Sequence, residues 1–184
     1  MKQFWITILG LASVGWAFAQ DIPPLPPLRG DAATLNDTMK FLNDKLPSKV
    51  NYTMSSHNTI TGTDSAVVKK SYEVSYITTN AYGCSIRYNR QVDGQPLQNG
   101  SLPLKQVQDV VLQPMDQVTQ RAVAQAGHPE VNISISPAIF QVVAKIDSTH
   151  GLLIMYYDET LADRVSKALQ HAVDLCGGGN KDPF

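Results

Sequence analysis

The first regular pattern of apolar residues in the chain has a helical period. Apolar side chains recur every three to four positions after residue 33, at Leu35, Met39, Leu42 and Leu46. This spacing places them in one stripe along a helix. Thr34 followed by Asp37 is close to a capping box, and Pro47 ends the pattern. The sequence therefore predicts a helix over residues 34–46 that packs through a narrow apolar face.

From residue 49 the period changes to two, which is typical of strands with one buried face. Three segments alternate in this way, with apolar positions at Val50, Tyr52 and Met54, at Tyr72, Val74 and Tyr76, and at Cys84, Ile86 and Tyr88. Asp93-Gly94 then gives a strong signal for a hairpin turn. We predict a further strand over residues 104–112, with Pro114 as its end signal.

The middle of the chain is less regular. Residues 115–126 fit a weak helix and a polar loop equally well, and Gly127-His128-Pro129 ends this segment in either case. Two alternating segments follow, with apolar positions at Val131, Ile133 and Ile135, and at Phe140, Val142, Ala144 and Ile146. Residues 152–157 are apolar on both faces, which predicts a central strand.

The clearest helical pattern lies near the carboxyl end. Thr160 with Asp163 resembles a capping box, which predicts that the helix begins there. One face carries the apolar residues Leu161, Val165, Ala168, Leu169, Ala172 and Cys176. The glycine triplet that begins at Gly177 stops the helix, and a polar tail follows over residues 179–184.

These elements predict a mainly β (α+β) domain over residues 34–178, with about seven mostly antiparallel strands. A helix precedes the strands and a longer helix follows them. This order resembles the pleckstrin-homology-like superfold, in which two near-orthogonal sheets form a partly open barrel and the last helix covers one end. The resemblance rests on element order and implies an extra helix at the amino end of this chain.

The segment from Tyr156 to Gly179 carries a second resemblance. It is similar to the ending of uncharacterised bacterial exported domains, which also tend to carry a cysteine on a strand and a Gly-His-Pro step. Here those features are Cys84 and Gly127-His128-Pro129. The resemblance covers most of residues 34–179 and implies an exported bacterial protein, but it implies no activity.

Residues 1–19 independently predict export. Lys2 precedes a short apolar stretch, and Ala17-Phe18-Ala19 forms the small-x-small pattern of a secretory signal peptide. The stretch is shorter than a spanning helix requires, so cleavage is favoured over the alternative of an uncleaved anchor. Residues 20–33 are rich in proline and predict a semi-rigid spacer. The expected location is periplasmic or extracellular, with no membrane span after cleavage.

Export would place the two cysteines of the chain, Cys84 and Cys176, in an oxidising compartment. Both fall on predicted apolar faces, and an oxidising compartment favours a disulfide between them over two buried free thiols. Catalysis is disfavoured because His171 and Cys176 are five positions apart on one helix, so their side chains diverge. The carboxyl end of a helix also raises the pKa of a thiol.

Other candidate chemistry is weak. The spacing of the four histidines does not match a metal-binding motif such as His-x-x-x-His. These histidines are His57, His128, His150 and His171. Asp158-Glu159 is best explained by the preference of acidic residues for the start of a helix. The chain has none of the glycine-rich motifs of phosphate or dinucleotide sites. We therefore predict no cofactor, no metal and no catalytic residue.

The net charge and the positions of the basic and aromatic residues argue against several classes of ligand. A formal net charge of −1 argues against nucleic-acid binding. A lipid headgroup would require convergence of basic residues, and the candidates are Lys69, Lys70, Arg87 and Arg90. Arg87 and Arg90 differ by three positions and so project to opposite faces of a strand. Core packing is favoured over a stacking platform for the alternating tyrosines Tyr72, Tyr76 and Tyr88.

The sequence as a whole favours a non-catalytic exported binding module. An unidentified protein or peptide is the expected partner, bound as an added strand at an open sheet edge or beside the last helix. The alternative is an exported hydrolase whose site is assembled only in three dimensions. That alternative requires a cleft that joins His128 or His150 to a hydroxyl nucleophile and a carboxylate.

Overall fold

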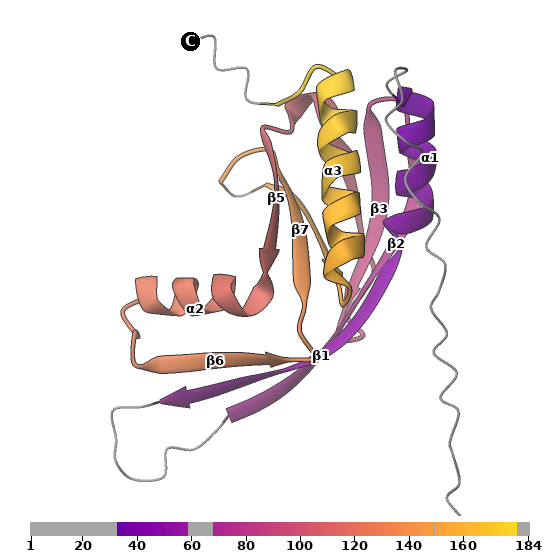
Figure 1. The fold of residues 1–184 in the computed structure, drawn as a ribbon. Helices are drawn as coiled ribbons and strands as arrows, with labels where there is room; N and C mark the ends of the chain where they lie inside the picture. Colours follow the sequence, from indigo (N-terminus) through magenta and orange to yellow (C-terminus); the bar gives the residue numbers. More distant parts are fainter. Residues whose placement is uncertain (1–32, 59–67, 149, 180–184) are drawn as a thin grey trace, which may run out of the picture. The chain divides into compact units, whose positions relative to one another are not determined.

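The computed structural model describes residues 33–58, 68–148 and 150–179 (Figure 1). The helices are α1 (Leu35–Lys45), α2 (Met115–Gln125) and α3 (Glu159–Leu175), with a 3-10 turn η1 (Leu104–Gln106). The strands are β1 (Ser48–Asn58), β2 (Val68–Tyr82), β3 (Ser85–Val92), β4 (Gln98–Pro103), β5 (Asp109–Pro114), β6 (Val131–Ser136), β7 (Phe140–Lys145) and β8 (Gly151–Tyr156). The predicted signal peptide (residues 1–19) and nearly all of the predicted spacer (residues 20–33) lie outside the described residues.

Five of the strands form one antiparallel sheet in the order β4-β3-β2-β1-β6. Its inner face carries the apolar positions that the period of two predicted, and Val50, Val74 and Ile86 are almost fully buried there. The predicted Asp93-Gly94 turn is confirmed, since both residues have positive φ angles of 48° and 68°. Polar residues occupy the alternate positions of these strands and face outward.

The other three strands form a second antiparallel sheet in the order β5-β7-β8. The prediction of a central strand over residues 152–157 is wrong in this respect, because β8 lies at an edge and β7 is central. Leu152, Ile154 and Met155 are nevertheless buried, and β8 also contacts β1. Both faces of β8 are therefore apolar because other parts of the fold pack against them, and not because a strand pairs with β8 on each side.

Helices α1 and α3 pack against each other and against the sheets (Figure 1). The capping box of α1 is confirmed, because Thr34 and Asp37 bond reciprocally at its amino end. The predicted start of α3 was two residues late. Asp158 is its N-cap, and its carboxylate accepts hydrogen bonds from the backbone N–H groups of Thr160 and Leu161. An aspartate at this position stabilises the first turn in the same way as the predicted threonine cap.

The segment predicted as one strand over residues 104–112 is divided. Leu104 and Val107 are both buried, and the N–H of Val107 donates to the carbonyl of Leu104 to close η1. Strand β5 begins only at Asp109, and β4 was missed because Leu102 is its single large apolar residue before the final proline. Residues 115–126, which the sequence left open, contain helix α2, although no side chain of α2 is fully buried.

The α+β class and the two terminal helices are confirmed, while the described strands number eight rather than about seven. The two sheets do not close into a barrel. Helix α2 and β6 are inserted between β5 and β7, and β6 returns to the five-stranded sheet beside β1. No helix among the described residues is long and apolar enough to cross a membrane.

Buried tyrosines make the stability of the fold sensitive to alkaline pH. Burial raises the pKa of Tyr76 to about 12, although the nearby Arg90 guanidinium opposes this effect. Between pH 10 and 12 the unfolded chain releases a proton that the folded chain retains. The free energy of unfolding therefore falls by about 1.4 kcal/mol per pH unit from this one group as the pH rises. Below pH 10 the contribution is constant.

We expect Tyr76→Phe to reduce this alkaline slope. The Tyr76 hydroxyl has no hydrogen-bond partner among the described residues, so the substitution leaves neutral-pH stability nearly unchanged. Urea unfolding at pH 9, 10 and 11 measures both quantities. Equal slopes for Tyr76→Phe and the parent protein would show that this phenol does not resist ionisation in the fold.

Candidate functional site

The disulfide between Cys84 and Cys176 is confirmed. The two Cα atoms are 5.6 Å apart, and the bond ties the end of α3 to the chain between β2 and β3. Cys84 lies in the turn just before β3 rather than on the predicted strand. Both sulfur atoms are covalently paired, which leaves neither cysteine as a thiol nucleophile. A disulfide of this kind is typical of proteins in an oxidising compartment.

Two of the histidines contact carboxylates within their own turns. His150 Nδ1 lies 2.8 Å from Asp147 Oδ2, and the backbone N–H of His150 donates to the same side chain. Asp147, Ser148 and His150 line one surface depression. His128 Nδ1 lies 3.3 Å from Glu130. These pairs join residues two or three positions apart in the chain, and the pair of His150 lies at a depression that Ser148 also lines.

The other two histidines are separate from these pairs. His57 is exposed on β1, whereas His171 Nε2 lies 3.0 Å from the carbonyl oxygen of Ala33 and holds the start of the described chain against α3. The described residues contain no group of three or more histidine, cysteine or acidic side chains placed to hold a metal ion. Asp158 and Glu159 occupy the helix start as expected.

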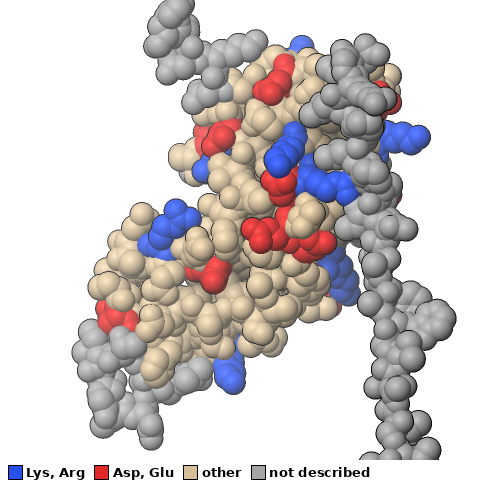
Figure 2. Space-filling model, in the orientation of Figure 1, with Lys and Arg blue, Asp and Glu red and all other residues tan. Residues whose placement is uncertain are grey.

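The basic candidates do not converge. Lys70 lies over the ring of Tyr72, and Arg90 lies over the buried ring of Tyr76. Arg87 is exposed on the outer face of β3, opposite to Arg90, as the spacing predicted. Basic and acidic side chains are interspersed over the face that Figure 2 shows. This surface therefore offers no broad basic patch to an anionic ligand.

The tyrosines that the sequence singled out are not arranged as a stacking platform. Tyr76 is buried, and Tyr88 packs against the core and covers Gly100 of the neighbouring strand. Tyr72 is half-buried and stacks on Tyr52, with ring centroids 5.1 Å apart. Core packing accounts for these rings.

Side chains cap the backbone at several exposed edges of the five-stranded sheet. Asn43 of α1 bonds to both the N–H and the carbonyl of Ala81, at 2.7 Å each, where β2 extends beyond β1. The hydroxyl of Tyr157 contacts both the N–H and the carbonyl of Asn51, just before the point where β6 begins to pair with β1. Edge backbone that is satisfied in this way is a poor template for an added strand.

The outer edge of β6 is capped in the same manner by Gln120 of α2. Its amide nitrogen donates to the carbonyl of Val131, and its oxygen accepts from the N–H of Ile133, both at 2.8 Å. We expect Gln120→Ala to lower the free energy of unfolding by about 1–2 kcal/mol, because two backbone groups lose their partner. The same variant is expected to self-associate, since the edge of β6 becomes available for pairing.

Urea unfolding and light scattering measure these two effects. Gln117→Ala is the matched control, because Gln117 is exposed on the same helix and its side chain makes no such bonds to β6. Equal behaviour of the two variants would contradict a capping role for Gln120.

The candidate site is an open depression on the outer face of the five-stranded sheet. Its volume is about 470 Å³, and its walls are the exposed parts of β1 and β2, the turn after β3 and the end of β6. The lining residues are Asn51, Tyr52, Thr53, Ser71, Tyr72, Glu73, Asp93, Ser136 and Pro137. The strand register places Ser136, Thr53 and Ser71 in one row across three strands, and the hydroxyls of the last two lie 3.2 Å apart.

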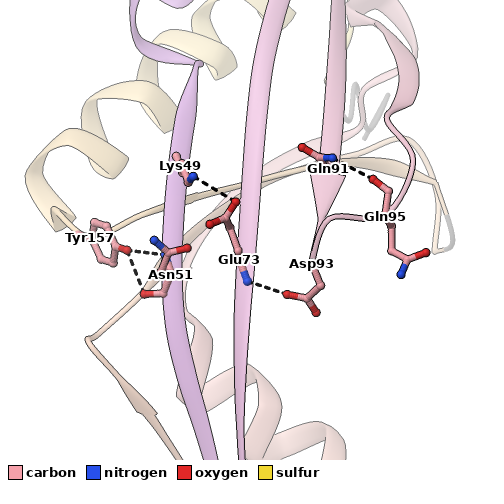
Figure 3. Close-up of polar contacts among 7 residues, drawn as sticks. All are labelled: Lys49, Asn51, Glu73, Gln91, Asp93, Gln95 and Tyr157. Atoms are coloured by element: carbon pink, nitrogen blue, oxygen red, sulfur yellow. Dashed lines mark hydrogen bonds and ion pairs between the residues drawn. The ribbon is translucent and has the colours of Figure 1, made fainter.

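Polar contacts fix the groups around this depression (Figure 3). Lys49 Nζ lies 3.1 Å from Glu73 Oε1, so the carboxylate charge is paired. The carboxylate of Asp93 accepts the backbone N–H of Glu73 at 2.7 Å, which holds the turn after β3 against β2. Tyr157 approaches from the other side of β1 and is 45% exposed. The residues that line the site thus supply hydroxyls, an amide and carboxylates, and Tyr157 lies beside it at Asn51.

This depression was missed at the level of sequence. Its outward residues occupy the polar positions of strands whose apolar positions defined the core. Polar residues at alternate positions are expected on any strand face that contacts solvent. The alternation therefore cannot distinguish a ligand-binding surface from an ordinary outer face. Tyr157 gave no separate signal because it follows directly on the apolar run of β8.

The fold and this site define an α+β protein with a polar surface depression on a sheet. Comparisons of the chain with protein families, with curated proteins and with solved structures found no match.

Proposed function

We propose that the protein is an exported, non-catalytic binding module that takes a neutral, polyhydroxylated ligand, a saccharide, in the depression on its outer sheet face. The observation that carries the proposal is the clustering of hydroxyl, amide and carboxylate groups around Asn51, Thr53, Ser71 and Glu73. These groups both donate and accept hydrogen bonds, as vicinal sugar hydroxyls also do. The volume of about 470 Å³ falls within the range of small-molecule sites.

Charge supports a neutral ligand over an ionic one. The Glu73 carboxylate is paired with Lys49, and the Asp93 carboxylate accepts the backbone N–H of Glu73, so both carboxylates of the depression already have partners. Tyr157 is not a lining residue, but it lies beside the depression, where its side chain is exposed and its hydroxyl is held by the backbone of Asn51. An aromatic ring that is apolar on its face and anchored at its polar tip suits the C–H face of a sugar.

The proposal includes a pleckstrin-homology-like fold and export to an oxidising compartment. A four-strand meander, a three-stranded sheet and a final helix support the pleckstrin-homology-like order, with α2 and β6 as an insertion. The disulfide supports an oxidising compartment, and the signal-peptide pattern of residues 1–19 supports export to it.

Titration of the ¹⁵N-labelled protein with neutral oligosaccharides tests the proposal. Suitable probes are the tetramers of glucose, N-acetylglucosamine and xylose in their common linkages. We expect at least one of them to shift the backbone amide signals of Asn51, Ser71 and Glu73. Asn51→Ala is expected to weaken that binding by roughly tenfold, which corresponds to the loss of one well-placed hydrogen bond.

Asn132→Ala is the matched control, because Asn132 is an exposed amide on the outer face of β6 but does not line the depression. Binding that shifts amides elsewhere, or that both variants weaken equally, would reject this site. Absence of shifts with all three probe classes at millimolar concentration would reject the saccharide as ligand.

A further inference from the structure

The outer edge of β4 differs from the capped edges of the same sheet. The N–H of Leu104 donates to the carbonyl of Cys84, which fixes the direction of the backbone groups that follow β4. Because these directions alternate along an antiparallel strand, the backbone groups of Asn99, Ser101 and Pro103 face away from β3. Among the described residues no side chain caps these groups.

The composition of this edge suits a neutral partner. Strand β4 reads Gln-Asn-Gly-Ser-Leu-Pro and carries no charged side chain, whereas exposed edges are commonly protected by lysine. Pro103 lacks an N–H group, but its carbonyl remains available as an acceptor. Leu97, just before the strand, is 48% exposed.

We propose that β4 pairs with β4 of a second copy of this chain, antiparallel and about a two-fold axis at Gly100. In this register Asn99 faces Ser101 of the second copy, and each pair exchanges two backbone hydrogen bonds. Leu97 then faces Pro103 of the second copy, so the exposed leucine gains an apolar contact at each end. The pairing is closed by symmetry and does not continue into a fibre.

Gly100 fits the position on the axis. Residues on the axis form a non-hydrogen-bonded pair, in which the two backbones approach most closely, at about 4.5 Å between Cα atoms. A Cβ atom at Gly100 would lie 2.3 Å from the ring of Tyr88, so a side chain there would require that ring to move. The ring of Tyr88 covers the glycine from the core side of the sheet.

A second copy accounts for this edge better than an unrelated peptide does. The edge is uncharged and therefore does not repel itself, and the ends of the strand complement each other as leucine against proline. The inference stands apart from the saccharide proposal, because β4 does not line the depression. Dimerisation and sugar binding can therefore fail separately.

Charge exchange across the axis tests the register. The double variant Asn99→Lys with Ser101→Lys places like charges opposite each other, whereas Asn99→Asp with Ser101→Lys places opposite charges together. Sedimentation equilibrium of the exported chain at low salt should give twice the monomer mass for the parent. We expect the Lys/Lys variant to dimerise at least roughly tenfold more weakly, and the Asp/Lys variant to remain dimeric.

Both variants carry two charged substitutions at exposed positions, so a general effect on folding would move them together. A parent protein that remains monomeric up to millimolar concentration would overturn the proposal. A dimer that both variants leave unchanged would place the interface elsewhere and would overturn it equally.

Discussion

Replacement of Cys84 and Cys176 by alanine is expected to lower the free energy of unfolding by about 4–5 kcal/mol. The reason is the size of the loop that the disulfide closes, since the two residues are 92 positions apart. The bond restricts the unfolded chain far more than the folded one, in which both residues are already held by β3 and α3. A loss of this size is a large part of the stability of a typical domain.

Urea unfolding of the oxidised parent, the reduced parent and the double alanine variant measures this effect. The reduced parent is the control, because it retains both side chains and lacks only the covalent bond. We expect the reduced parent and the variant to unfold at similar urea concentrations, well below the oxidised parent. Equal stability of all three would show that the loop between the cysteines is already restricted in the unfolded state.

The partnership of these cysteines could be predicted because the sequence contained most of its determinants. Cys176 follows the apolar stripe of α3, and Cys84 lies in the turn directly before β3, in phase with its buried positions. Two cysteines allow one intramolecular pairing, so a correct reading of the two faces and of the compartment was sufficient. Helices α1 and α3 were also predictable, because spacing, caps and stop signals are local properties of the chain.

The order of the strands in the sheets was harder to predict from the sequence. Whether β8 lies at an edge or at the centre depends on which strands pair, and its apolar pattern is the same in both cases. Strand β4 has a glycine and little apolar alternation, so it becomes a strand through its pairing with β3. The position of β6 beside β1 is a long-range pairing that local patterns do not encode.

The candidate site shows the same limit. Asn51, Thr53 and Ser71 come from two strands that a long connection separates, and their meeting depends on register. The caps supplied by Asn43 and Gln120 are likewise visible only in three dimensions, because each amide bonds to the backbone of another element, 38 positions away for Asn43 and 11 for Gln120. Sequence reasoning identified the outer face as polar but could not find the place where the polar groups converge.

Leu169→Ala is expected to lower the free energy of unfolding by about 3–5 kcal/mol. Leu169 lies on the buried face of α3 and has no exposed surface, and Val165, Ala172 and Val173 of the same helix are equally buried. Truncation removes apolar contacts and leaves a cavity that the surrounding core cannot fill completely. Because α3 contacts α1 as well as β5, β7 and β8, the loss is expected to weaken the packing of the three-stranded sheet and of α1.

Leu175→Ala is the matched control for this effect. It makes the same chemical change in the same helix, but Leu175 is 46% exposed at the end of α3. We expect it to cost less than about 1 kcal/mol, since little buried volume is lost. Chemical unfolding of the two variants with the disulfide intact gives the comparison directly. Similar losses for Leu169→Ala and Leu175→Ala would contradict the placement of α3 over the core, because burial would then not determine the cost of truncation.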